Sequence, residues 1–270
     1  GLGDVYKRQP QKMIIDHFLT TNTLFVLTAV FLGCFVKGAL GFGLPLIATP
    51  IMMFVLPLPE IVAILVLPIA IANLYQIWLN RAHWRVLQKF WPLIAASTLI
   101  MLLGAPIMVF LDGNFLGILI GLMIFLHALL SGLPLSLLQA PSLTPGTMQK
   151  MIIPAGVVSG LLGSLTSMYS FPSLQLMLMM RVPKDDLNLL LGAFLSLGYI
   201  ALWIGILKTG FPVGNNLALS ALMMIPAVAG QQAGHIARKN ISEAVFRHFV
   251  HFALACAGLM LMVKGSSGLI

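Results

Sequence analysis

A short segment rich in glycine and proline, with a lysine beside it, contains the residues best suited to bind a small anion. It reads KGALGFGLPLIATP, from Lys37 to Pro50, and it lies between two apolar runs. Inside a bilayer, irregular backbone is tolerated only where protein or a water-filled cavity covers it. The segment is therefore either a tight helix-packing seam or a broken helix that lines a site.

A second segment of the same kind occurs in the other half of the chain. Residues 160–172 read GLLGSLTSMYSFP, and Gly163 and Pro172 follow Gly41 and Pro50 at one constant offset. Apolar segments interrupted by Gly or Pro at matching places in two halves are the best sequence indication of a transporter's binding site. The duplication thus favours the broken-helix interpretation.

These two segments offer an anion a charge, hydroxyl groups and helix N-termini. A membrane lysine such as Lys37 is unfavourable unless it pairs, faces water or snorkels, so it is either an anion-attracting group or an anchor. The N-terminus of a half-helix presents free N–H groups and a partial positive charge. Any single Ser, Thr or Gly is more simply explained by close helix packing. Taken as a cluster, they predict a substrate site formed by Lys37, Gly38, Gly41, Phe42, Gly43, Thr49, Pro50, Gly163, Ser164, Thr166, Ser167, Tyr169, Ser170 and Pro172.

Other kinds of chemistry find little support in the sequence. No Ser-His-Asp, H-E-x-x-H or paired-carboxylate arrangement occurs, which argues against an enzyme. Cys34 and Cys256 have no metal-ligand spacing, so we expect neither a metal ion nor another cofactor. No carboxylate occupies the middle of an apolar run, which weakens a cation-coupled mechanism. The amides Asn73 and Gln76 lie in an apolar run, where they either line a cavity or, more simply, join helices.

The composition is that of a polytopic membrane protein. Hydrophobic residues make up 59% of the chain and charged residues 8%, whereas soluble domains carry roughly 25% charged residues. Spans of about 20 residues allow about eight to ten transmembrane or re-entrant helices, so the expected fold class is all-α. The net charge of +8 comes largely from short loops between apolar runs, which makes the lipid bilayer the expected partner and argues against nucleic acid. A homo-oligomer is compatible with the sequence.

Loop charges predict how the two halves are oriented. We divide the chain into a non-native or disordered leader (1–12), a first transmembrane repeat (13–133), a linker (134–150) and a second transmembrane repeat (151–270). The basic loop 80–89 corresponds to the uncharged turn 209–216, and the acidic turn at Asp112 corresponds to the basic loop 235–248. Because basic loops stay cytoplasmic, this exchange predicts inverted repeats with both termini outside. Each broken segment then becomes part of a hairpin, and the two hairpins meet near the midplane.

The order and duplication of these motifs resemble the sulfite exporter TauE/SafE family. The shared pattern is G-x-x-G-F-G followed by an apolar run and Pro at residues 38–50, repeated in weaker form at 160–172, with a His-Trp-Arg loop at 83–85. The resemblance extends over nearly the whole chain from about Phe18. It implies an inner-membrane exporter of sulfite, an organosulfonate or a related sulfur-containing anion. Alternating access between the broken hairpins is the expected mechanism; the alternatives are a channel-like anion pathway or a membrane-embedded subunit of a larger assembly.

Overall fold

The chain folds into a bundle in which every described regular element is a helix. A computed structural model of the chain describes residues 21–41, 43–132, 144–212, 217–240 and 243–268. The helices are α2 (Thr21–Leu40), α3 (Leu44–Met52), α4 (Leu58–Leu79), η1 (Arg81–His83), α5 (Arg85–Phe110), α6 (Gly113–Gly132), α7 (Pro145–Lys150), α8 (Ile152–Thr166), α9 (Ser173–Met179), α10 (Lys184–Leu207), α11 (Leu217–Leu222), α12 (Met224–Asn240) and α13 (Glu243–Ser267). The expected leader, Phe42 and most of the expected linker lie outside the described residues.

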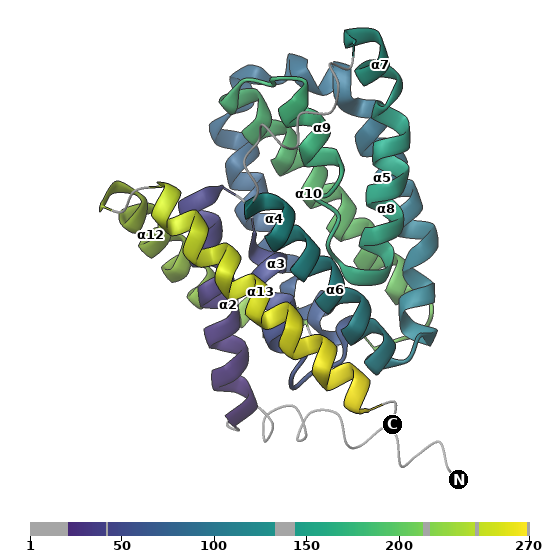
Figure 1. Ribbon diagram of the computed structural model, residues 1–270, viewed down its shortest axis with the longest axis vertical. Coiled ribbons are helices and arrows are strands. Elements are labelled where there is room, and N and C mark those ends of the chain that lie inside the picture. The colour runs from purple at the N-terminus through teal and green to yellow at the C-terminus, as the bar shows by residue number, and fades with distance from the viewer. Residues whose placement is uncertain (1–20, 42, 133–143, 213–216, 241–242, 269–270) are drawn as a thin grey trace.

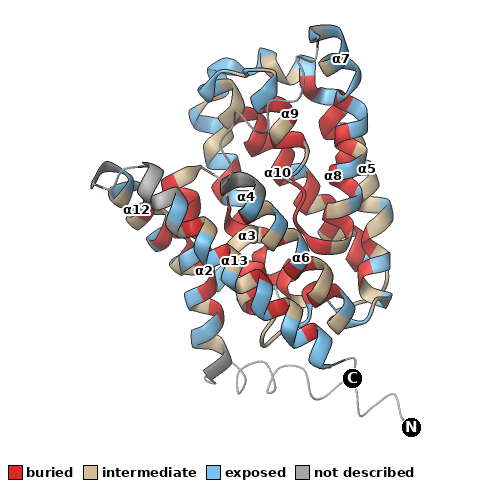
Figure 2. Cartoon of the chain, in the orientation of Figure 1, coloured by how far each residue is buried: buried red, intermediate tan, exposed pale blue. Residues whose placement is uncertain are grey.

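Six of the described helical segments are long and apolar enough to cross a membrane. They are α2, α4, α5, α10, α13 and Leu217–Arg238, which joins α11 to most of α12. Helix α10 is central, because 78% of its apolar window is buried, against 28% for α13. Figure 2 shows buried residues gathered where α10, α8 and α5 face one another. The all-α architecture expected from the composition is confirmed, and the six long apolar helices are compatible with a multi-pass membrane protein.

Both glycine- and proline-rich segments interrupt helices. Between α2 and α3, Gly41 and Gly43 have φ angles of 89° and 112°, in the left-handed region that favours glycine. Between α8 and α9 the chain leaves helical geometry over residues 167–172. We call these two interruptions the first break and the second break. The short helices that follow, α3 with 9 residues and α9 with 7, are too short to cross a membrane. At 1.5 Å per residue they reach only about 14 Å and 10 Å, against a hydrocarbon core of about 30 Å.

Helices from the two halves of the chain pack directly on one another. Helix α12 lies along α2, α8 lies along α5, α4 packs on α10, and α6 packs on α13. Glycines permit the closest of these approaches. A Cβ atom on Gly234 would lie 2.1 Å from the carbonyl oxygen of Phe35, and one on Gly160 would lie 2.7 Å from that of Ser97. Small residues that let helix backbones approach are typical of packing in membranes.

Two contacts between segments distant in sequence mark the opposite ends of the helix bundle. At one end, His83 of η1 pairs with Asp186 in the first turn of α10, with 2.7 Å between Nδ1 and Oδ1. At the other end, the Lys264 ammonium near the end of α13 donates to the carbonyl oxygen of Met53, just after α3, at 3.1 Å. Figure 1 shows the start of α2 (purple) and the end of α13 (yellow) at the lower end of the molecule, with α7 at the upper end.

Several helices extend further than hydropathy predicts. Helix α5 begins at Arg85, inside the expected basic loop 80–89, and α12 continues to Asn240. Hydropathy marks where apolar side chains stop, whereas Arg, Lys, Gln and Glu prolong a helix readily. The apolar run that begins at Leu217 is divided at Met223 into α11 and α12. Pro226 explains this division, because it has no N–H to donate to the carbonyl oxygen four residues earlier.

Candidate functional site

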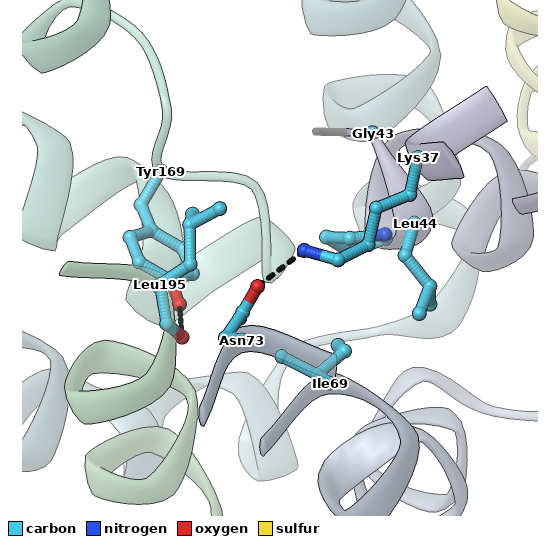
Figure 3. Close-up of a pocket in the computed structure, with 8 residues that line it drawn as sticks. Lys37, Gly43, Leu44, Ile69, Asn73, Tyr169 and Leu195 are labelled. Atoms are coloured by element: carbon cyan, nitrogen blue, oxygen red, sulfur yellow. Dashed lines mark hydrogen bonds between the residues drawn. The ribbon is translucent and has the colours of Figure 1, made fainter. Parts of the chain in front are cut away.

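A small cavity lies where the first break meets α4, α10 and the second break. Its lining, drawn in Figure 3, consists of Lys37, Gly43, Leu44, Pro45, Ile69, Asn73, Tyr169 and Leu195. Both halves of the chain contribute to this lining. The cavity has room for about one water molecule. The four heavy atoms of a sulfite ion would not fit, so the described conformation is closed around this point.

Lys37 brings an uncompensated charge into the cavity. Its side chain is 5% exposed, and among the described residues it is the only charged side chain that is buried. It points into the bundle, where its ammonium donates to the Asn73 side-chain oxygen and, at 3.3 Å, to the Gln76 side-chain oxygen (Figure 3). No carboxylate of the described residues pairs with it. A buried cation held only by neutral oxygens is unfavourable by itself, and an anion beside it would remove that penalty.

The amide groups of α4 fix the lysine and connect it to α10. Gln76 accepts from Lys37 and donates from its side-chain nitrogen to the Asn188 carbonyl oxygen at 2.9 Å. Asn73 lines the cavity itself. The sequence allowed each amide either to line a cavity or to join helices. In the structure Asn73 lines the cavity, and Gln76 joins two helices.

Helix α3 points its N-terminal end at the same cavity. Gly43 precedes the helix and lines the cavity, as do Leu44 and Pro45, the first two residues of α3. The first-turn N–H groups of a helix have no intrahelical partner, and the end carries a partial positive charge. Pro45 fits this position because its missing N–H is one of those that the helix leaves unpaired. The helix end and the lysine thus create positive potential on one side of the cavity.

Tyr169 of the second break forms the opposite wall. It is 1% exposed, and its hydroxyl donates to the carbonyl oxygen of Leu195 on α10 (Figure 3). Its ring centre lies 5.2 Å from that of Phe194. Two glycines leave space for the ring, because a Cβ on either Gly163 or Gly198 would lie 2.6 Å from a Tyr169 side-chain atom. Packing and hydrogen bonding together hold this wall in one position.

Helix α3, which follows the first break, touches the second break through a pair of hydroxyl groups. Thr49 on α3 and Ser167 at the start of the second break are fully buried, and their side-chain oxygens lie 3.3 Å apart in a hydrogen bond. Ser167 has a φ angle of 60°, in the left-handed region. This contact links segments from different halves of the chain beside the cavity.

Of the residues predicted from the sequence, Lys37, Gly43 and Tyr169 line the cavity. The Ser164 and Thr166 hydroxyls donate within their own helix, to the carbonyl oxygens of Leu161 and Leu162. The others lie elsewhere: Gly38 packs against the backbone of Gln231, Gly41 belongs to the first break, Pro50 is buried within α3, Gly163 packs against Tyr169, and Ser170 and Pro172 belong to the second break.

Sequence reasoning did not assign Leu44, Pro45, Ile69, Asn73 or Leu195 to the site, yet all five line the cavity. For Asn73 a signal exists, since an amide in an apolar span needs a partner. For Ile69 and Leu195 there is none, because both are apolar residues in apolar spans.

A family model described as Sulfite exporter TauE/SafE matches residues 25–261 of the chain. No curated protein and no solved structure matches the chain. The matched range includes every residue that lines the cavity, together with both breaks.

Proposed function

Because the chain belongs to the sulfite exporter TauE/SafE family, we propose that it exports a small sulfur-containing anion, such as sulfite or an organosulfonate. The proposed location is the inner membrane, and the proposed site is the cavity between the two breaks. The six apolar helices of membrane-spanning length agree with a multi-pass transporter. Transport of this kind requires no cofactor and no enzymatic step.

Lys37 is the observation that carries the proposal. It is a buried cation whose partners are neutral amide oxygens, so the site lacks one negative charge that a substrate anion would supply. Export would also use the membrane potential. At an inside-negative potential, outward movement of one negative charge gains about 2.3 kcal/mol per 100 mV.

Inverted repeats are the second element of the proposal, and helix pairing supports them. A two-fold relation would exchange α2 with α8, α4 with α10, α5 with α12, and α6 with α13. The contact of α2 with α12 then becomes the contact of α8 with α5, and both occur. The α4–α10 and α6–α13 contacts map onto themselves, as contacts across a two-fold axis do. The extensive α5–α10 contact has only a smaller counterpart, formed by α4 with α11 and α12. Both termini would lie outside, with each break at the tip of a re-entrant hairpin.

The small cavity agrees with an occluded state of a carrier. A channel needs a continuous opening, whereas this site has room for about one water molecule. An anion could enter only if one break moved relative to the other, which is the essence of alternating access. Because both halves of one chain complete the site, the third possibility, a subunit that depends on a larger assembly, has less support.

The decisive experiment is anion flux in proteoliposomes that contain only the purified protein. Sulfite, sulfoacetate and sulfate would be compared, each with and without an imposed potential. We expect saturable, potential-driven flux of one of the sulfur anions. Flux that rises linearly with concentration would favour the channel. Absence of flux for all three anions, in liposomes with correctly folded protein, would overturn the proposal.

A further inference from the structure

One face of α10 carries buried polar groups that have no hydrogen-bond partner. They are the Ser196 hydroxyl, the Tyr199 hydroxyl and the Trp203 indole N–H, each unpartnered among the described residues. Ser196 and Tyr199 are 3% and 1% exposed. Their spacing along the helix places all three within an arc of about 60°. We call them the α10 donor face. Buried polar groups without partners are rare in folded proteins, so three on one face require an explanation.

The donor face begins at the cavity and is directed toward α4. Gly192 lies on the same face of α10, and a Cβ there would lie 3.2 Å from the carbonyl oxygen of Asn73 on α4. Leu195, the neighbour of Ser196, lines the cavity together with Asn73 and Ile69 of α4. The donor face therefore starts where α10 meets α4 at the cavity.

The α4 side of this interface is apolar beyond the cavity. Helical spacing from Ile69 leads to Val66 and Val62, and all three are buried. The other end of the donor face is the end of α10 at Leu207. This is the opposite end of the molecule from Asp186 in the first turn of α10, which pairs with His83. From Leu195 to Trp203 the face extends about 12 Å.

The chemistry of this face suits an oxyanion. Hydroxyl and indole groups donate hydrogen bonds, no carboxylate belongs to the face, and the α4 residues at helical spacing from Ile69 are apolar. We infer that the donor face is a second, transient binding site for the oxygen atoms of the anion, between the cavity and the Leu207 end of α10. This inference rests on the proposed export function. The anion would leave Lys37 and exchange its contacts for Ser196, Tyr199 and Trp203 in turn, without regaining a full hydration shell.

Conservative removal of the donors tests this route. The combined variant Ser196→Ala, Tyr199→Phe and Trp203→Phe keeps most of the packing but removes the donors. We expect maximal flux to fall roughly two- to tenfold per donor, with an apparent KM close to wild type because the cavity is intact. Thr98→Val is the matched control, since it removes another buried, unpartnered hydroxyl, on α5. Flux of the combined variant equal to that of Thr98→Val would overturn the inference.

A labelling experiment gives an answer that does not depend on flux. Ser196→Cys is placed in a background with Cys34→Ala and Cys256→Ala, and exposed to the anionic reagent 2-sulfonatoethyl methanethiosulfonate. We expect modification at this position but not at Ala201→Cys, a buried position on another face of α10. Equally low reactivity at both positions, in protein that transports normally, would overturn the inference alone. Absence of sulfur-anion flux in the wild-type protein would instead overturn the proposed function.

Discussion

Among single residues, Lys37 has the largest expected effect on substrate affinity. Lys37→Met removes the only buried charge of the described residues while keeping a long unbranched side chain. Hydrogen bonds to charged groups contribute about 1.5–3 kcal/mol, so we expect the apparent KM for the transported anion to rise roughly 10- to 150-fold. The apparent KM is measured from the dependence of flux on anion concentration in proteoliposomes. Lys208→Met, at an exposed position, is the matched control. An unchanged KM in Lys37→Met would reduce Lys37 to a structural residue.

The sequence identifies some residues of the site and not others, for a physical reason. Lys37 and Gly43 stand out because charge and left-handed backbone are both unusual at membrane depth. Ile69 and Leu195 cannot be recognised, because they join the cavity only through the packing of α4 against α10. Ser and Thr residues cause the opposite error, because the sequence assigns them to the site when they do not line the cavity. Their hydroxyls can bond carbonyl oxygens of their own helix, as Thr166 does at 2.6 Å, so a hydroxyl-rich stretch need not face a site.

For helices, the close glycine contacts between the halves predict that replacing these glycines with alanine lowers the stability of the protein. In Gly234→Ala the new Cβ would lie 2.1 Å from the carbonyl oxygen of Phe35, so α12 must move away from α2. Overpacking of this kind typically destabilises a protein by about 1–3 kcal/mol. We expect a lower thermal unfolding midpoint in detergent, and a change in the same direction for Gly160→Ala at the α5–α8 contact. Gly146→Ala, which meets nothing within 4 Å, is the control. Equal midpoints for Gly234→Ala and this control would contradict the packing.

The interruptions of the helices were easier to predict than their ends. Gly41, Gly43 and the repeated Gly/Pro spacing located both breaks, because few other residues tolerate such backbone inside a membrane. The exact limits of helices were predicted less well, as at Arg85, where α5 begins, and Asn240, where α12 ends, because charged helix formers extend a helix beyond its apolar run. Which helices pair across the halves also needed the structure, since Gly234 and Phe35 are distant in sequence.

For the whole molecule, the contact between α3 and the second break offers a test of alternating access. The side-chain oxygens of Thr49 and Ser167 lie 3.3 Å apart, so Thr49→Cys with Ser167→Cys would place two thiols close together. Cys34 and Cys256 would first be replaced by alanine. If transport requires α3 to separate from the second break, oxidation should abolish flux and a reducing agent should restore it. Each single-cysteine variant, treated with the same oxidant, should keep its flux. Undiminished flux in protein shown to be cross-linked would exclude movement at this contact.

The arrangement of the two ends predicts which exposed residues face the cytoplasm. Ala82 lies in η1 beside His83, which pairs with Asp186, and the neighbouring chain is rich in basic residues. Ser266 lies near the opposite end, close to Lys264. Because basic segments stay cytoplasmic, we expect an impermeant maleimide to label Ser266→Cys in intact cells and Ala82→Cys only after permeabilisation. Both variants are made in protein in which Cys34 and Cys256 are replaced by alanine. Reversed labelling would place both termini inside, whereas labelling of both positions in intact cells would contradict the assignment of η1 and the end of α13 to opposite ends of the molecule.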